Sequence, residues 1–281
     1  MTAAFRTEAL GHFTDEKEFK VEASRAIAYA AATNDTNNRH ISGELAPPVF
    51  AIVPVWDVMT AAAGLVTPRP AFEQIVHAAQ DMRFFRPIAP GDVLRSKAAP
   101  VHVAVRGVGT TVVLRTETVD VTGAAVNEQF VTLFFRGRFE GHSGGDPAPE
   151  HKLTAAVKSG VPDVEVTYRF DEDQTFRYAE ASGDPVRIHL DDAAARAVGL
   201  PGIIIHGLCT MAFCGRAVIE TVAGGDPTRL ARLAVKFSRP VLPGQEITVR
   251  IYRTGDRSFG FEALNTESQA VVKDGLAEVR A

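Results

Sequence analysis

Two acid/base side chains stand five positions apart in the segment YAEASGDPVRIHLDD, residues 178–192. Asp184 follows a small Ser-Gly pair where a helix is expected to end, and His189 comes just before an acidic helix start at Asp191. A carboxylate and an imidazole on one loop can hold the same water, one accepting a proton while the other donates one. Histidine suits this role because its unperturbed pKa lies near neutrality. The pair indicates addition of water across an activated double bond. Its structural alternative is that Asp184 is a turn or capping residue and His189 a surface residue.

A second chemical element follows at His206-Gly207, which opens the apolar stretch predicted to form the helix His206–Val222. The N-terminus of a helix presents unpaired N–H groups and a partial positive charge. A glycine there lets a carbonyl oxygen approach its N–H closely. We expect Gly207 to serve as an oxyanion site for an enolate or thioester oxygen. The alternative is a glycine that only starts the helix.

The elements that must position these residues follow from the apolar pattern. The helix His206–Val222 is apolar on nearly every face, so it should be buried. A short strand, Val164–Phe170, and an amphipathic helix, Asp173–Ala181, precede it, and strands with alternating or β-branched runs follow it. One helix before a run of antiparallel strands predicts an α+β fold in which a sheet wraps around a buried helix.

The chain also contains an internal repeat. MRFFRPIAPGDVL at 82–94 resembles VKFSRPVLPGQEI at 235–247, and AIAYAAATND at 26–35 resembles TFRYAEASGD at 175–184. A third match, APPVFAIVPV against LPGIIIHGLC, lies between these two in both halves. Three matches in the same order at nearly one offset predict two similar halves.

The length fits this division, because 281 residues exceed the roughly 100–200 of a typical domain. We predict an N-terminal half at 1–139, a linker at 140–162 and a C-terminal half at 163–281. The linker is rich in Gly, Pro and Ala.

The N-terminal half repeats the acid/base pair without the oxyanion glycine. Asp35 stands where Asp184 stands, and His40 lies five residues after it. Pro54 takes the place of Gly207, and proline has no N–H to donate. We therefore expect the complete site only in the C-terminal half.

Bulk properties restrict the class of protein. The formal net charge of −4 gives no electrostatic case for binding nucleic acid. Cys209 and Cys214 are not placed to form a disulfide, which fits a reducing compartment. The start lacks the apolar core of a signal peptide, and no apolar run approaches the roughly 20 residues of a membrane span. We expect a cytoplasmic protein without membrane or nucleic-acid partners.

The segment around Asp184 resembles the motif of the MaoC-like dehydratases, also called hydratase 2, which are hot-dog enzymes acting on 2-enoyl thioesters. The matching residues are Tyr178, Ser182, Gly183, Asp184, Ile188, His189 and Ala195. Ile205-His206-Gly207 resembles the oxyanion segment of the family, and FSRPVLPG at 237–244 resembles the strand and turn that follow it. Val186-Arg187 replaces the Asn-Pro of the family motif, and Pro185 stands earlier.

The resemblance implies a fused double hot-dog, with two antiparallel sheets that each wrap around a central helix. It implies catalysis by Asp184, His189 and Gly207. The residues expected to bind substrate are Ser182, Val186, Arg187, Phe237 and Arg86. For Arg86 a solvated strand end, and for Phe237 core packing, are the alternatives.

The implied reaction is reversible hydration of trans-2-enoyl-CoA to (3R)-3-hydroxyacyl-CoA. A hot-dog thioesterase and a non-catalytic subunit that binds acyl thioesters are the competing hypotheses. We expect no metal or redox cofactor, because no Cys/His cluster has ligand spacing and no Gly-rich dinucleotide loop follows a strand. The partners expected are the acyl-CoA substrate alone or a second copy of the chain, since a fused pair can work as a monomer or a homodimer.

Overall fold

The chain forms two compact units whose segments interleave along the sequence. In the computed structural model, which describes residues 4–281, the first unit takes the described residues up to Lys20, then Pro54–Phe85 and Val93–Glu150. The second unit takes Val21–Val53, Arg86–Asp92 and His151–Ala281. Part of the N-terminal sequence therefore packs with the C-terminal half. The division at 1–139, 140–162 and 163–281 stays a prediction about the repeat.

The first unit is built on an antiparallel sheet in the order β2-β4-β5-β6-β3. Its strands are β2 (Lys17–Lys20), β4 (Val93–Arg106), β5 (Gly109–Asp120), β6 (Ala125–Arg136) and β3 (Ile75–Phe84). Helix α3 (Trp56–Val66) packs on β4 and β5. The smaller elements of this unit are β1 (Ala4–Phe5), η2 (Arg69–Gln74), β7 (Glu140–Gly141) and β8 (Gly144–Gly145). The chain passes from the second unit into the first within η1 (Pro48–Val55).

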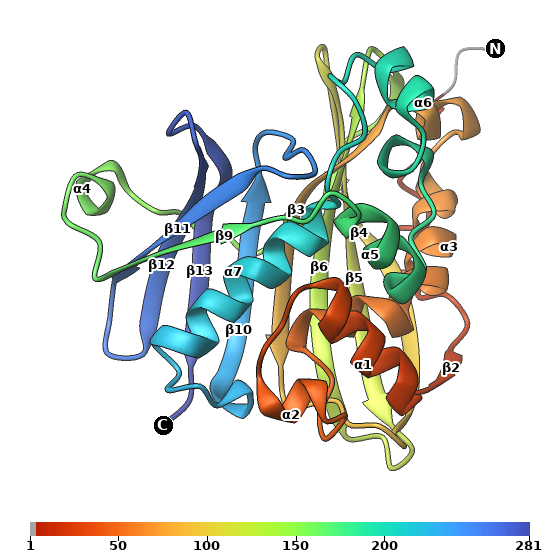
Figure 1. The fold of residues 1–281 in the computed structure, drawn as a ribbon. Helices are drawn as coiled ribbons and strands as arrows, with labels where there is room; N and C mark the ends of the chain where they lie inside the picture. Colours follow the sequence, from red (N-terminus) through yellow and green to blue (C-terminus); the bar gives the residue numbers. More distant parts are fainter. Residues whose placement is uncertain (1–3) are drawn as a thin grey trace. The chain divides into compact units, whose positions relative to one another are not determined.

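The second unit repeats this strand order. Its antiparallel sheet runs β9-β11-β12-β13-β10, so the opening strand lies at one edge in both units. The strands are β9 (Val164–Arg169), β11 (Glu246–Arg253), β12 (Ser258–Asn265), β13 (Ala270–Val279) and β10 (Leu230–Phe237). Helix α7 (Gly207–Thr221) lies across this sheet and packs on β9, β10, β11 and β13 (Figure 1). The predicted repeat and the predicted helix over 206–222 are thus present in the structure.

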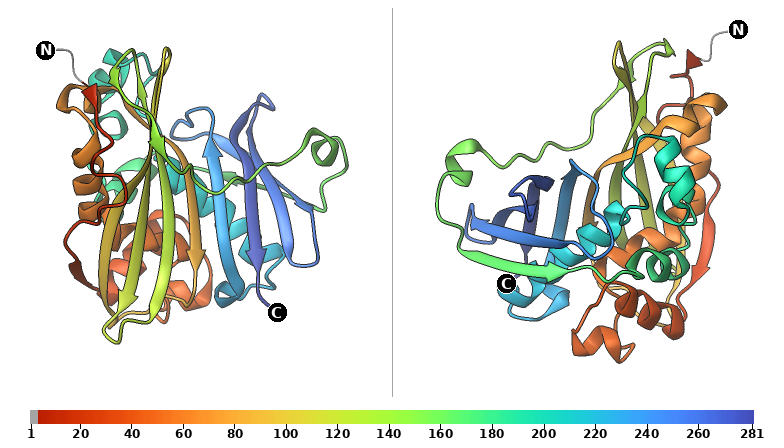
Figure 2. Two further views of the ribbon diagram at one scale, coloured as in Figure 1. Left: turned by 180° about the vertical axis from the view of Figure 1, so that it is seen from behind. Right: turned by 45° about the horizontal axis from the view of Figure 1, so that its top comes forward.

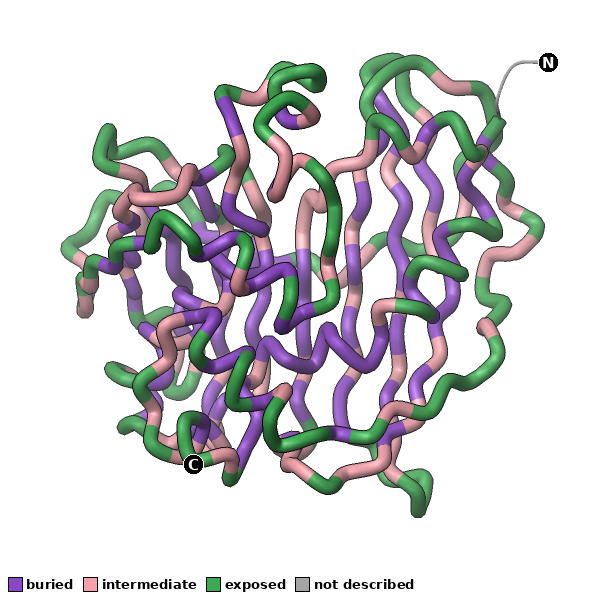
Figure 3. The backbone as a smooth tube through the Cα atoms, turned by 45° about the vertical axis from the view of Figure 1, so that its right-hand side comes forward, coloured by how far each residue is buried: buried purple, intermediate pink, exposed green. Residues whose placement is uncertain are grey.

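Helix α7 forms the buried core of the second unit, as its burial pattern shows. Ten of its fifteen residues are buried, among them the free thiols Cys209 and Cys214. Strand β11 alternates between buried and partly exposed residues, as expected for a sheet with one covered face. Figure 3 shows buried residues along the strands and exposed ones in the turns that join them. The hydrophobic effect, about 25 cal/mol per Å² of buried apolar surface, favours this arrangement.

One expectation about apolar runs is wrong. Pro48–Val66 is a helical stretch of 19 residues with a mean hydropathy of 1.9, long and apolar enough by composition to cross a membrane. In the structure 67% of its apolar window is buried, and a core helix meets the same test, so this is weak evidence for a membrane span. Pro54 lies inside its first part, η1, which is a 3-10 helix.

Short helices of the second unit carry the loops of interest. They are α1 (Ala23–Ala32), α2 (Asn38–Ile41), α4 (Ala155–Lys158), α5 (Gln174–Ser182), η3 (Arg187–His189), α6 (Asp192–Ala197) and η4 (Pro227–Arg229). The loop that carries α4 leads into β9, as both views of Figure 2 show. Helices α1 and α5 are repeat counterparts and pack against each other. Their tyrosines meet, with the hydroxyl oxygens of Tyr29 and Tyr178 3.0 Å apart and both side chains fully buried.

For this tyrosine pair we expect a double-mutant cycle in which the losses of unfolding free energy are not additive. Tyr29→Phe or Tyr178→Phe leaves one buried hydroxyl without its partner, which we expect to cost about 1–3 kcal/mol of unfolding free energy. The double variant removes both hydroxyls and should cost less than the sum of the two single changes. Urea denaturation of the four proteins measures the coupling. Strictly additive losses would show that the hydroxyls do not stabilise each other.

Candidate active site

The loop that carries Asp184 begins where α5 ends in a left-handed residue. Gly183 has φ +78°, a conformation that glycine adopts without strain. Ser182 Oγ donates to the Tyr178 carbonyl oxygen at 2.7 Å and accepts from the Asp184 N–H at 3.3 Å. Arg25 of α1 adds donors to the carbonyl oxygens of Ala181 and Ser182. The turn is therefore held by groups from both halves of the sequence.

The Asp184 carboxyl group is largely withdrawn from water. Its side chain is 13% exposed, and one oxygen accepts from the Val186 N–H at 3.2 Å. Burial raises the pKa of Asp184 to about 6, and the Val186 hydrogen bond opposes the shift. A carboxyl group with this pKa can act as an acid close to neutral pH.

The His189 imidazole is oriented by the backbone. Its Nδ1 lies 2.8 Å from the Ile204 carbonyl oxygen, which can only accept, so Nδ1 carries the proton and Nε2 holds a lone pair. Burial lowers the pKa of His189 to about 4, although the bond to Ile204 opposes the shift. The side chain is therefore a neutral base with one nitrogen committed and one available.

A second histidine, His206, completes the cluster. Its ring stacks on that of His189 with centroids 3.7 Å apart and an interplanar angle of 22°. His206 Nε2 lies 3.2 Å from the Asp184 carbonyl oxygen and 4.0 Å from a carboxylate oxygen of the same residue. Its Nδ1 lies 3.1 Å from Thr175 Oγ. Burial and the neighbouring His189 lower the pKa of His206, so it stays neutral and fixes the Asp184 backbone beside His189.

The sequence indicated His206 only as the residue before Gly207. No spacing signal reports that two rings will stack, because the contact joins η3 to the start of α7. The same holds for Thr175, whose hydroxyl lies within hydrogen-bond distance of the carbonyl oxygens of His189 and Ile204. Both residues are buried polar groups that hold the loop with Asp184 and His189 in place.

Asp184, His189 and His206 also form a candidate metal site. One ligand atom from each of Asp184, His189 and His206 lies within 4.8 Å of the others. His206 Nε2, however, faces a carbonyl oxygen and must carry a hydrogen there. One nitrogen and one carboxylate remain, whereas protein metal sites use three or four ligands. The arrangement suits a bound water better than a metal ion.

Gly207 is the first residue of α7, as expected for an oxyanion donor. Its N–H is among those that a helix leaves without an intrahelical acceptor. A side chain at this position would collide with Phe237 of β10, since an ideal Cβ would lie 3.2 Å from two ring carbons. The structure thus brings Gly207 and Phe237 together.

The remaining predicted residues lie in different surroundings. Val186 is 43% exposed beside Asp184, and the exposed Arg187 forms an ion pair with Asp191. Arg86 forms an ion pair with Asp92 at 2.7 Å. Ser182 is buried, and its hydroxyl is used in the two hydrogen bonds at the end of α5. Roles in substrate binding for these four residues stay predictions.

Known proteins resemble this chain over most of its length. Residues 153–274 match the family model of the MaoC like domain, and residues 8–129 match that of the FAS1-like, dehydratase domain region. The 3-hydroxyacyl-thioester dehydratase Y of Mycobacterium tuberculosis is 31% identical over 269 residues, which cover 90% of this chain and 89% of that protein. The probable enoyl-CoA hydratase 2 of Dictyostelium discoideum is 26% identical over 72% of this chain and 69% of its own.

Solved structures share the fold. A MaoC-like dehydratase from Phytophthora capsici superposes with a TM-score of 0.85 at 23% identity, covering 97% of this chain and 98% of that one. A conserved hypothetical protein from Mycobacterium tuberculosis, described as having a double hotdog fold, gives a TM-score of 0.63 at 14% identity over 96% and 95% of the two chains. The predicted α+β double hot-dog is confirmed.

The buried carboxyl group predicts a pH-dependent gain of stability on substitution. Folding raises the pKa of Asp184 from 3.8 to about 6, so its favourable contribution is complete below pH 3.8 and is lost as pH rises through 6. Asp184→Asn should therefore raise the free energy of unfolding at pH 7.5 by at most about 3 kcal/mol, and by less than about 1 kcal/mol at pH 4. Denaturant titrations at the two pH values measure this. The exposed Asp192→Asn is the matched control, and an equal gain at both pH values would contradict the burial of charge at Asp184.

The contact at Gly207 predicts a steric defect with a specific suppressor. Gly207→Ala forces its Cβ against the Phe237 ring, and we expect kcat/KM to fall about ten- to a hundredfold because the start of α7 is displaced. Phe237→Leu in the same chain should restore part of the lost kcat/KM, because the smaller side chain leaves room for the added methyl group. Gly64→Ala, at an open helical position of α3, is the control and should be neutral or slightly stabilising. Wild-type activity in Gly207→Ala would argue against a close approach of substrate there.

Proposed function

Because the chain belongs to the MaoC-like dehydratase family, we propose that it is a hydro-lyase that interconverts trans-2-enoyl-CoA and (3R)-3-hydroxyacyl-CoA. One observation carries the proposal. The Asp184 carboxyl group and the lone-pair nitrogen of His189 belong to one buried cluster at the start of α7. The names of the relatives, a 3-hydroxyacyl-thioester dehydratase and an enoyl-CoA hydratase 2, support the substrate class.

The protonation states favour a division of labour between the two residues. In the dehydration direction, neutral His189 accepts the α-proton at Nε2, and protonated Asp184 donates to the leaving hydroxyl, which departs as water. Hydration is the reverse, with Asp184 taking a proton from water and His189 delivering one to the α-carbon. The lowered pKa of His189 and the raised pKa of Asp184 support the dehydration assignment, because each residue can then be in the required form.

The thioester oxygen requires its own stabilisation as enolate character develops. Gly207 offers a backbone N–H with the partial positive charge of the α7 N-terminus behind it. Such a donor typically contributes about 10²–10³ in rate. In this proposal Phe237 keeps the glycine surface free of other side chains and borders the bound thioester.

The thioesterase alternative depends on a free carboxylate on the buried helix. Glu220 is the only acidic residue of α7, and its oxygens already accept from Arg216, at 2.6 Å, and from the Tyr168 hydroxyl, at 2.7 Å. A carboxylate held in this way is a poor nucleophile or base. The proposal also includes a cytoplasmic monomer or homodimer that takes the acyl-CoA as its partner.

A spectrophotometric assay separates these activities. Purified protein is mixed with crotonyl-CoA and with longer and branched enoyl-CoAs, while enone absorbance and free thiol are followed together. We expect loss of enone absorbance without release of thiol, and chiral analysis should give the (3R) product. Release of thiol would indicate a thioesterase, and binding without turnover of any acyl chain would indicate a non-catalytic subunit.

Substitutions test the assignment of the active residues. Asp184→Asn and His189→Gln should each lower kcat about 10²–10⁴-fold, since each removes one proton-transfer group. Asp192→Asn, on the exposed start of α6, is the matched control for the loss of a carboxylate. If Asp35→Asn abolished turnover while Asp184→Asn did not, the active half would be wrongly assigned.

A further inference from the structure

Helices α1 and α5 of the second unit each receive hydrogen bonds at their C-terminal end from an arginine of the other helix. Arg25 of α1 donates from Nε to the Ala181 carbonyl oxygen at 3.3 Å and from Nη2 to the Ser182 carbonyl oxygen at 3.4 Å. Arg177 of α5 donates from Nη1 to the Ala31 carbonyl oxygen, near the end of α1, at 2.8 Å. The last carbonyl groups of a helix have no intrahelical donor and carry a partial negative charge, so an arginine there supplies both hydrogens and positive charge.

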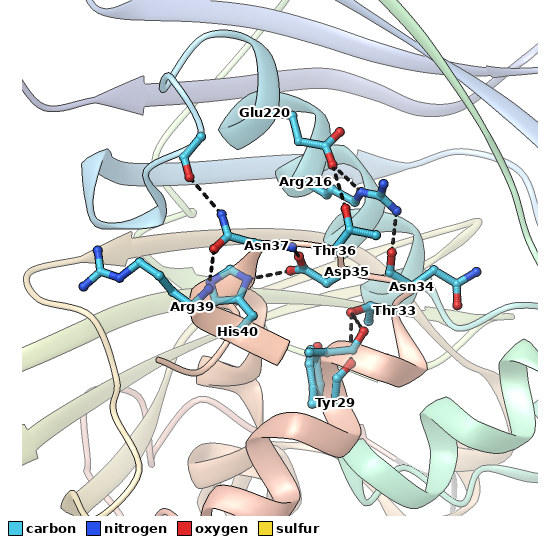
Figure 4. Close-up of polar contacts among 12 residues, drawn as sticks. Tyr29, Thr33, Asn34, Asp35, Thr36, Asn37, Arg39, His40, Arg216 and Glu220 are labelled. Carbon is cyan, nitrogen blue, oxygen red and sulfur yellow. Dashed lines mark hydrogen bonds and ion pairs between the residues drawn. The ribbon is translucent and has the colours of Figure 1, made fainter. Parts of the chain in front are cut away.

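The two helix ends lead into loops that are held differently. The loop after α1 contains Asp35, whose carboxylate lies 2.7 Å from His40 Nδ1 (Figure 4). Arg216 of α7 also donates to the Asn34 carbonyl oxygen in this loop, as the same figure shows. The loop after α5 contains Asp184, the acid of the proposed reaction. One arginine contact of the same kind therefore precedes each aspartate.

A short chain of hydrogen bonds joins Arg25 to the Asp184 carboxyl group. Ser182 has two parts in it, because its carbonyl oxygen accepts from Arg25 and its Oγ accepts from the Asp184 N–H at 3.3 Å. The Asp184 carboxyl group then accepts from the Val186 N–H at 3.2 Å. A displacement of the Ser182 backbone would therefore displace the carboxyl group.

The Arg25 guanidinium also lies directly against the turn. An ideal Cβ at Gly183 would lie 3.0 Å from Arg25 Nη2. Glycine is favoured at this position by its φ of +78°, and its lack of a side chain also leaves room for the guanidinium. Arg25 thus packs on the residue that precedes Asp184 as well as bonding to the two residues before it.

We propose that Arg25 is a positioning residue for Asp184, an inference that rests on the proposed hydration function. It fixes the end of α5 and so holds the turn that places the Asp184 carboxyl group beside His189. Arg25 contacts no reacting atom and transfers no proton. Through this arginine, the N-terminal repeat contributes to a reaction for which it lacks the oxyanion glycine.

Matched substitutions of the two arginines test the proposal. Arg25→Met keeps the apolar stem and removes the hydrogen-bond donors. With the enoyl-CoA that the wild-type protein hydrates fastest, kcat should fall about tenfold and KM should change less than about twofold, because the acid is misplaced in the bound complex. Arg177→Met makes the same change at the end of α1 and should leave kcat within about twofold. Arg177 also forms ion pairs with Asp171 and Asp173, so a loss of kcat caused by lower stability alone would appear in Arg177→Met as well.

Hydrogen exchange reports on the turn without any substrate. In Arg25→Met the Asp184 and Val186 N–H groups should exchange about fivefold faster or more, because the turn that holds them has lost its support. Arg177→Met should leave both rates unchanged. Arg25→Lys keeps the charge but replaces the forked donor with one nitrogen, so its kcat and exchange rates should lie between those of the wild type and Arg25→Met.

The outcomes separate this proposal from the proposed function. Faster exchange with unchanged kcat in Arg25→Met would overturn the positioning role, as would equal losses of kcat in Arg25→Met and Arg177→Met. A wild-type protein that hydrates no enoyl-CoA would overturn the proposed function, whereas unchanged exchange at Asp184 in Arg25→Met would show that Arg25 does not hold the turn. Arg25→Lys keeps both readouts available if Arg25→Met does not fold.

Discussion

A hydrogen bond between two buried tyrosine hydroxyls joins helices α1 and α5, each of which leads into a loop with an Asp–His pair. Tyr29 and Tyr178 are repeat counterparts, and their contact lies within the second unit. A left-handed residue follows shortly after each helix and directly precedes an aspartate: Asn34 comes after the cap residue Thr33 of α1, and Gly183 caps α5. Because the two helices pack on each other, a shift in the position of either helix would displace both loops. Arg25 of α1 also supports the end of α5, because it donates to the Ala181 and Ser182 carbonyl oxygens, so the N-terminal sequence helps to hold the candidate site.

The same spacing of aspartate and histidine leads to two different arrangements because the Nδ1 partner differs. His189 gives Nδ1 to a backbone carbonyl, which leaves Asp184 separate, buried and raised in pKa. Two groups with opposed pKa shifts can then exchange protons with one substrate. His40 instead binds its own aspartate through Nδ1, and its Nε2 is buried without a hydrogen-bond partner among the described residues. Repeat halves that began alike can thus diverge through one hydrogen bond.

Features that depend on residues close together in the sequence could be predicted, and features that depend on contacts between distant segments could not. The candidate residues Asp184, His189 and Gly207 could be selected from the sequence because motif spacing and a helix start are local features, and their roles stay predictions. The repeat was accessible because matching segments keep one offset, and the strand order of both units agrees with it. The positioning roles of His206 and Thr175 could not be predicted, since they arise from contacts between η3, α5 and α7. The apolar run Pro48–Val66 was underestimated because Pro54 and Asp57 divide it in the sequence, although the helix continues past both.

The departure at Val186-Arg187 is best understood from the backbone. The bond that Asp184 receives from position 186 comes from the Val186 N–H, which every residue except proline supplies. That bond lowers the pKa of Asp184, and burial, the larger influence, raises it. Loss of an asparagine side chain therefore leaves the acid/base character of Asp184 intact. It leaves an exposed apolar side chain, Val186, beside the Asp184 carboxyl group, so the replacement changes the surface next to this group rather than its protonation.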